Sequence, residues 1–152
     1  MKVTCSVKNL DGMLSSLNGY KDRILSGCHT AAAELAEITQ TTAQRLVPVK
    51  TGALRDSIST AAQQTSLGAV AVVTVGEHYG AYVEYGTGPR GQLSPSARPG
   101  VTYRTTPWTY VDMEGHFHRT SGMPARPFFY PAFLECERRM ESVVKSHIRG
   151  VL

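Results

Sequence analysis

The sequence has little of several features that would decide its class at once. Its three cysteines, Cys5, Cys28 and Cys136, are an odd set with no close pair, which argues against a disulfide framework and a zinc site. No stretch approaches the ~20 apolar residues that a membrane-spanning helix needs. The first residues lack the apolar segment of a secretory signal peptide. We therefore expect a chain that folds in a reducing compartment and crosses no membrane.

Charged residues are also scarce, at 18% of the chain, and basic residues outnumber acidic ones to give a formal net charge of +4. This mild excess permits contact with nucleic acid or an acidic protein surface but is too small to indicate either. A length of 152 residues suits one domain with a substantial core. We predict a single domain over residues 1–152, with residues 1–18 as an N-terminal arm and residues 87–122 as a loop and hairpin extension.

Two amphipathic helices are predicted from apolar residues that recur at spacings of four and three. The first covers residues 24–46 and ends before Pro48, which disfavours helical geometry at the preceding residue. A separate short helix precedes it and ends near Gly19, because glycine often follows the last residue of a helix. The second runs from Phe129 to near Gly150. The apolar stripe of the first helix consists of Ile24, Cys28, Ala31, Leu35, Ile38 and Thr42.

The middle of the chain favours short strands. Residues 58–64 and 69–76 predict two strands joined by a turn, and the almost unbroken apolar run in the second is typical of a strand covered on both faces. Residues 101–104 predict another strand, and residues 108–111 and 116–119 predict a hairpin. Residues 79–86 fit a strand or a helix, and the Pro- and Gly-rich residues 87–100 predict a loop. The fold class is therefore α+β, with a small antiparallel sheet packed against a long helix in the N-terminal half and a C-terminal helix.

Several residues are expected to shape the backbone rather than bind anything. Pro48 fixes a turn, Thr51 caps a short helical turn, and Glu84, surrounded by tyrosines, is interpreted as a hydrogen-bonded structural residue. The full set of structural residues is Pro48, Thr51, Gly52, Leu54, Glu84, Gly86 and Pro127.

No pattern indicates catalysis. Cys28 precedes His29, but neighbouring helical residues point about 100° apart and so do not face each other. His116 and His118 share one face of a predicted strand near Glu114, yet no third metal ligand joins them by spacing. We predict no catalytic residue, no metal and no cofactor.

Arginine and aromatic residues concentrate between residues 79 and 130, and both types are enriched at protein interfaces. They also suit single-stranded nucleic acid, because bases stack on aromatic rings beside cations. An oligomeric interaction module and a cytosolic nucleic-acid-binding module are therefore both open at this point. The predicted contact residues are Tyr82, Tyr85, Arg90, Arg98, Tyr103, Trp108, Phe117, Arg119, Arg126 and Phe128.

Three stretches in a fixed order resemble one family: "VPVKTGALRDSI", "HYGAYVEYGTG" and "ARPFFYPAF". Together they are similar to the small tail-component family of long-tailed double-stranded-DNA phages, which groups lambdoid head-tail joining and tail-completion proteins of the minor tail protein Z type. The likeness covers roughly residues 31–144. It implies a structural, non-enzymatic virion protein of the neck, assembled in the cytoplasm of the host bacterium.

The resemblance also implies partners. It implies a homo-oligomeric ring of six or twelve copies between the capsid-side connector or stopper proteins and the tail terminator or tail tube. Double-stranded DNA would pass through its lumen without sequence-specific binding. A tail-terminator or stopper ring of the same neck is the alternative. In this picture the loop at residues 87–100 is the joint, which orders when a partner docks, and the tyrosines before it fix its base.

Overall fold

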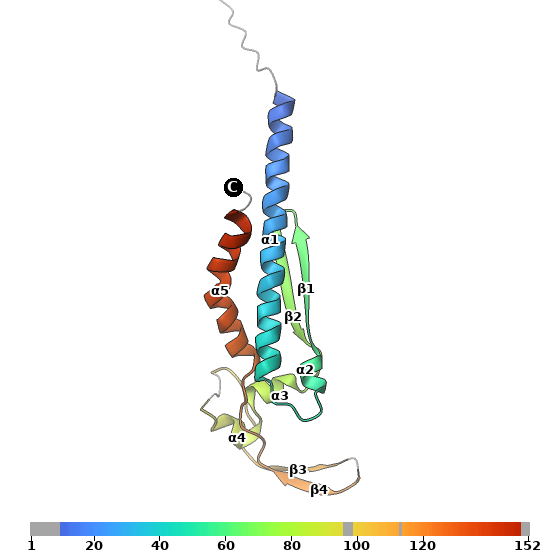
Figure 1. Cartoon of the computed structure of the whole chain (residues 1–152). Coiled ribbons are helices and arrows are strands. Elements are labelled where there is room, and N and C mark those ends of the chain that lie inside the picture. The colour runs from blue at the N-terminus through green and yellow to red at the C-terminus, as the bar shows by residue number, and fades with distance from the viewer. Residues whose placement is uncertain (1–9, 96–98, 113, 150–152) are drawn as a thin grey trace, which may run out of the picture.

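The computed structural model describes residues 10–95, 99–112 and 114–149 (Figure 1). The long helix α1 (Leu10–Leu46) runs beside the C-terminal helix α5 (Phe129–Arg149) and a hairpin of β1 (Ile58–Thr65) and β2 (Gly68–Val75). Below them lie α2 (Ala53–Asp56), α3 (Gly80–Tyr85), α4 (Gly88–Gln92) and a second hairpin of β3 (Trp108–Val111) and β4 (Phe117–Thr120). The predicted α+β class is confirmed, although the strands form two separate two-stranded sheets rather than one.

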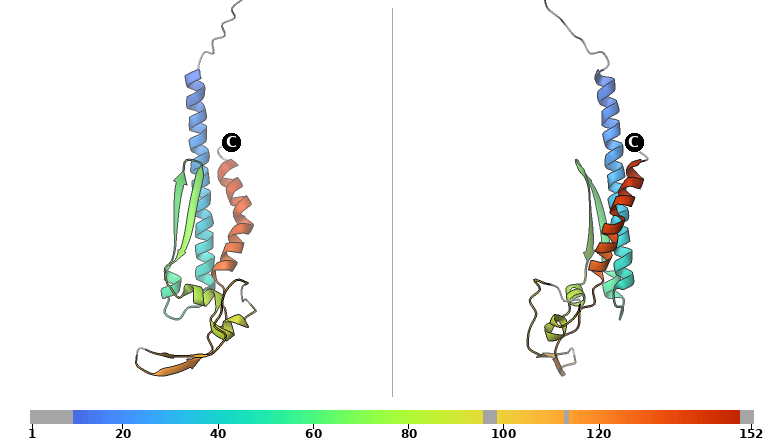
Figure 2. Two further views of the ribbon diagram at one scale, coloured as in Figure 1. Left: turned by 180° about the vertical axis from the view of Figure 1, so that it is seen from behind. Right: turned by 90° about the vertical axis from the view of Figure 1, so that its left-hand side faces the viewer.

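Helix α1 is one continuous helix, so the predicted break near Gly19 is wrong. A glycine inside a helix costs only about 1 kcal/mol relative to alanine, and Gly19 is not among the glycines with positive φ that could end a helix. The first turns of α1 extend beyond the sheet and α5 (Figures 1 and 2). Met13, Leu14 and Leu17 there are at least half exposed. The end before Pro48 is as predicted. The predicted extended segment at residues 3–7 lies outside the described residues.

The middle of α1 packs against the first sheet on one side and against α5, which runs antiparallel to it, on another. Its buried residues are small: Ala31, Ala36, Thr39 and Ala43. Only Ala31 belongs to the predicted stripe, whose other residues are half-buried. The most buried face is therefore rotated from the predicted one, because the helix packs against both the sheet and α5. The Nε2 atom of His147 on α5 lies 2.6 Å from the Oε2 atom of Glu34 on α1, which links the two helices.

The first hairpin has the predicted strands, with Ile58 opposite Val75 and Thr65 opposite Gly68. The prediction that its second strand is covered on both faces is wrong. Side chains alternate between α1 and solvent, so Val70 and Val72 are 54% and 52% exposed. A long apolar run indicates a doubly covered strand only when elements exist for both faces, and here α1 covers one.

The segment that fitted either a strand or a helix is helix α3. Its Val83 joins Leu54, Ile58, Phe128 and Ala132 in the hydrophobic core below the end of α1. Helix α2 starts after Gly52, whose φ of 90° is unfavourable for other residues. Thr51 therefore does not occupy the cap position, although its Oγ1 accepts a long hydrogen bond of 3.4 Å from the Ala53 N–H. Among the described helices, none is long and apolar enough to cross a membrane.

Candidate interaction surface

Glu84 ties the lower part of the molecule to α5. Its carboxylate is buried and accepts hydrogen bonds from the backbone N–H groups of Phe128 (2.7 Å), Phe129 (2.9 Å) and Tyr130 (3.0 Å). These groups lie at the start of α5, where backbone N–H groups have no partner within the helix and favour a negative charge. Glu84 is thus a long-range helix cap, and its bonds fix the position of α3 relative to α5.

Glycines let two segments pack backbone against backbone beneath α3. Thr87 and Met123 exchange backbone hydrogen bonds of 2.9 and 3.2 Å. A Cβ atom added to Gly122 would lie 1.9 Å from the Thr87 carbonyl oxygen, and one added to Gly86 would lie 2.6 Å from the Ala125 nitrogen. Both glycines have positive φ. We call this contact, residues 86–91 against residues 121–125, the glycine junction.

The glycine junction corrects the prediction of a loop over residues 87–100. The segment begins with the short helix α4, and its Gly88 and Gly91 are buried. The Trp108 ring packs on Gly88, where an added Cβ would lie 2.5 Å from the ring. The base of the predicted loop is therefore a packed structure.

An aromatic groove opens beside the glycine junction, with a volume of about 520 Å³. The Tyr103 hydroxyl donates a hydrogen bond of 2.9 Å to the Tyr85 carbonyl oxygen. The guanidinium carbon of Arg104 lies 5.3 Å from the centre of the Trp108 ring, a cation–π contact. Residues 101–104 are held here in an irregular conformation, so the predicted strand is absent. The groove brings together four predicted contact residues: Tyr82, Tyr85, Tyr103 and Trp108.

The other predicted contact residues are dispersed. Arg90 on α4 and Arg119 on β4 are exposed, and Phe117 on β4 is 79% exposed. Arg126 is also exposed but lines a different hollow, near Pro48 and Gly52.

Two predicted contact residues do not belong to the described surface. Phe128 is 1% exposed and lies in the hydrophobic core, so it has no surface to offer a partner. An aromatic residue beside prolines gives no sign in the sequence of which way its ring points. Arg98 lies outside the described residues.

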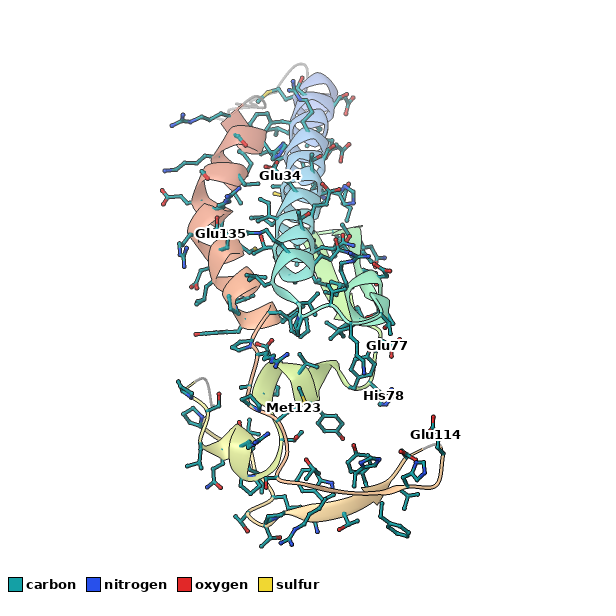
Figure 3. All side chains as sticks on the ribbon, turned by 60° about the horizontal axis from the view of Figure 1, so that its bottom comes forward. Glu34, Glu77, His78, Glu114, Met123 and Glu135 are labelled. Carbon is teal, nitrogen blue, oxygen red and sulfur yellow. The ribbon has the colours of Figure 1, made fainter. Side chains whose placement is uncertain are left out.

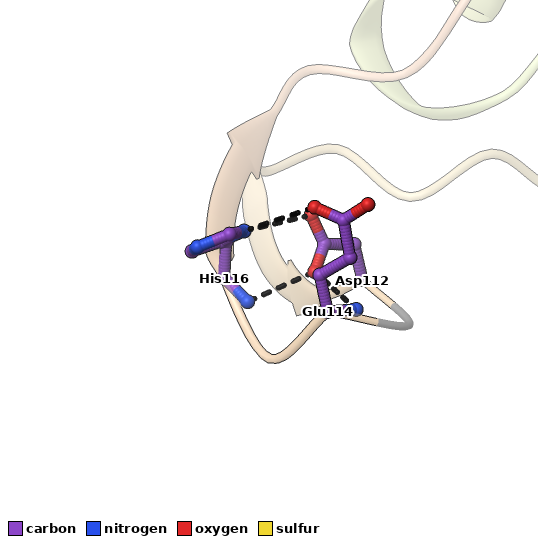
Figure 4. Close-up of side chains that lie close together, drawn as sticks. All are labelled: Asp112, Glu114 and His116. Carbon is purple, nitrogen blue, oxygen red and sulfur yellow. Dashed lines mark hydrogen bonds and ion pairs between the residues drawn. The ribbon is translucent and has the colours of Figure 1, made fainter.

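The turn of the second hairpin holds a cluster that the sequence reasoning missed in part (Figure 4). The Oδ1 atom of Asp112 accepts hydrogen bonds of 2.9 Å from the backbone N–H groups of Glu114 and His116. Its Oδ2 atom lies 2.7 Å from His118 Nε2 and 3.5 Å from His116 Nδ1. The hydrogen bond with His118, followed by that from the His116 backbone, lowers the pKa of Asp112. The signal for this role is an aspartate at the first position of a turn.

Ligand atoms of Asp112, Glu114 and His116 lie within 4.8 Å of one another and are of the types that bind divalent metals. The cluster is at the tip of the second hairpin (Figure 3), where the side chains of Glu114 and His116 are exposed. The hydrogen bonds of Asp112 already account for the arrangement as a turn, so we assign it a structural role.

A family profile described as "Bacteriophage HK97-gp10, putative tail-component" matches residues 11–86, which is half of the chain. The match covers α1, α2, the first sheet and α3. It includes the first of the three stretches on which the resemblance rests and most of the second. No curated protein and no solved structure matches the chain.

Proposed function

This chain belongs to the HK97-gp10-like family of bacteriophage tail components, and on that premise we propose that it is a structural subunit of the neck, where it joins or completes the tail. As a tail component it is a virion protein that assembles with other virion proteins. We further propose that several copies form a ring between the capsid-side connector or stopper and the tail terminator or tail tube, with double-stranded DNA passing through it. In this role the chain performs no catalysis.

The observation that carries the proposal is the aromatic groove on its glycine junction. Interface energy comes mainly from a few well-packed aromatic and arginine residues. Tyr82 is 58% exposed and Trp108 lies beside Arg104, so the groove presents residues of this kind on a closely packed base. A base that is already packed lowers the entropy lost when a partner binds. This feature suits a joint between proteins.

The segment that begins with the last residue of α4, Gln92, extends the proposed contact surface. Gln92 and Leu93 are exposed, and Leu93 is 84% exposed although it is apolar. We propose that this segment and the second hairpin contact the adjoining neck protein. The proposed contact residues are Tyr82, Tyr85, Arg90, Arg98, Tyr103, Trp108, Phe117, Arg119 and Arg126.

Complementation of a phage that lacks the gene tests this proposal. Wild-type protein should restore infectivity, whereas a variant without residues 92–97 should fold but leave heads and tails separate in electron micrographs. Leu67→Ser is a surface control, because Leu67 is also a largely exposed leucine, in the turn of the first sheet, and it should complement. Full infectivity without any copy of the protein would contradict the proposed function.

A label attached to the protein would show in electron micrographs whether it is a tail terminator or a stopper. Electron microscopy of heads and tails isolated separately would show whether the protein joins the tail end, as a terminator does, or the capsid side, as a stopper does. Salt-sensitive binding of oligonucleotides that is lost in Trp108→Ala would instead favour a nucleic-acid-binding module.

A further inference from the structure

The first sheet has two strands and two open edges, and we propose that these edges pair between copies of this chain. In this arrangement β1 of one copy lies along β2 of the next, beside α5 of that copy. The inference rests on the proposed ring and names the surface that would close it.

The backbone hydrogen bonds show which groups face outward. The Gly76 N–H donates to the Ser57 carbonyl oxygen at 3.1 Å, so residues 57 and 76 form a hydrogen-bonded pair. Because such pairs alternate along an antiparallel ladder, the residues between them point their backbone groups away from the hairpin. The Ile58 carbonyl accepts a bond of 2.7 Å from Gln40. Within the described chain, no hydrogen bond reaches the outward backbone groups of residues 60, 62 and 64 on β1 and 69, 71 and 73 on β2.

These edges lack the features that usually protect an exposed strand. Soluble proteins place lysine, proline or a bulge on an edge to prevent pairing with another chain. Between Asp56 and Glu77 this chain has no charged residue and no proline, and the register of the hairpin contains no bulge. The outward backbone groups of residues 60, 62 and 64 on β1 and of residues 69, 71 and 73 on β2 are therefore available to pair with a further strand.

The two edges differ in shape. The β2 edge borders an apolar groove of about 300 Å³ between α1, β2 and α5. Phe133 and Met140 in it are 51% and 46% exposed, and no charged residue lines it. Both strands pack against α1, and the groove places α5 beside the β2 edge.

Charge supports a second copy as the occupant. A charged strand in this groove would lose its hydration without gaining an opposite charge. Strand β1 carries no charge and faces α1 with residues such as Thr60 and Ala62, so it meets the groove without an unpaired charge. A partner segment with an acidic or basic residue would place an unpaired charge in the groove.

The direction of the strands allows the contact to repeat. Strands β1 and β2 are antiparallel, so rotating a copy about an axis along the strands brings its β1 antiparallel to β2 of the first copy. Each further copy uses the same two edges, and the ring closes when the last β2 meets the first β1. A twofold pairing of β1 with β1, or of β2 with β2, would leave one edge of each copy open.

Cysteine cross-linking in assembled particles tests the proposal. Cysteine-free chains carrying Ala61→Cys and chains carrying Val72→Cys are co-expressed during infection by phage that lacks the gene, and virions are oxidised. Ala61 and Val72 are exposed and opposite each other in the hairpin register. If two copies pair without a shift along the strands, Ala61 of one copy lies opposite Val72 of the next. This is a pair without backbone hydrogen bonds, with Cα atoms about 4.5 Å apart, a distance that a disulfide can span. The two substitutions must be on different chains, because one chain carrying both could close an internal disulfide.

The expected result is a disulfide-linked dimer from the mixture and none from either variant alone. Chains with Thr41→Cys, on an exposed position of α1, are the matched control and should not link to Ala61→Cys. Val70→Cys and Thr74→Cys cover a register shifted by two residues. Dimers from either variant alone would indicate a twofold pairing and overturn the proposal.

Virions that contain both chains but give no linked dimer at residues 70, 72 or 74 would also overturn it, while leaving the neck function intact. Virions that lack the protein would overturn the neck function instead. In that case the same mixture of purified proteins decides the edge pairing by itself.

Discussion

The upper and lower parts of the molecule are held together by different kinds of contact. In the upper part, α1, α5 and the first sheet pack through side chains with regular spacing, such as Ala36 and Ala43. In the lower part, α3, α4 and the second hairpin are joined by backbone contacts at the glycine junction. The upper part thus depends on a repeating pattern of side chains, whereas the shape of the lower part depends on single glycine residues. The family match covers α1 and the first sheet of the upper part but not α5, and it ends at Gly86, where the glycine junction begins.

The substitution with the largest expected effect is Gly122→Ala, which should unfold the lower part while the upper part stays folded. The added Cβ would meet the Thr87 carbonyl, and φ at this residue is 84°, so overpacking and backbone strain together should cost about 4 kcal/mol. Trp108 is the only tryptophan and lies in the lower part. Its fluorescence should therefore report loss of the lower part at low denaturant, while the circular dichroism at 222 nm still reports the helices.

Gly115→Ala is the matched control for this prediction. Gly115 has a φ of 88°, but an added Cβ would have no atom within 4 Å, so only the backbone strain of about 1–2 kcal/mol applies. Equal effects of the two substitutions would show that the close contact at the glycine junction contributes nothing.

A second substitution tests the link between the two parts. Glu84→Ala leaves three backbone N–H groups at the start of α5 without their acceptor, and unsatisfied buried groups of this kind cost about 1–3 kcal/mol each. With partial access to water we expect a total loss of about 3 kcal/mol in the free energy of unfolding, measured in urea. Glu84→Gln keeps one acceptor oxygen and should lose less. A larger loss in Glu84→Gln than in Glu84→Ala would contradict the capping role.

The contacts of Gly122 and Glu84 could not be predicted from the sequence, whereas other features could. The end of α1 before Pro48 and the hairpin of β1 and β2 follow from local signals, namely proline geometry and a turn between two apolar runs. The contact of Gly122 with Thr87 joins residues far apart in the chain, and no spacing pattern encodes it. A long sequence separation likewise hides the bonds of Glu84, although its place among tyrosines suggested a structural role.

The predictions that were wrong also depended on contacts that the local sequence does not encode. Gly19 has the local signal of a helix end, but its neighbours continue the helix at a small cost in free energy. The exposure of Val70 depends on how many elements cover the sheet, and the burial of Phe128 depends on where α5 starts. Four of the predicted contact residues do meet in the aromatic groove, because they lie on segments that converge on the glycine junction.

A smaller effect is expected in the upper part, at the projecting end of α1. Gly19→Ala meets no atom within 4 Å and removes the helix penalty of glycine, so it should stabilise this end by up to about 1 kcal/mol. The measurement is the helical signal at 222 nm as the temperature rises through the first stage of unfolding. A loss of helical signal would indicate that a kink at Gly19 is part of the native helix.

The smallest effect is a local dependence of the second hairpin on pH. The lowered pKa of Asp112 means that its ionised form stabilises the turn fully above the ordinary pKa of about 3.8, and that this stabilisation is lost as the pH falls from there through the lowered value. The amide resonances of Glu114 and His116, which donate to this carboxylate, should shift in that range. Asp112→Asn retains an acceptor oxygen for the turn but cannot ionise, so its amide resonances should not follow the same titration. If the variant titrates like the wild type, another group controls the turn.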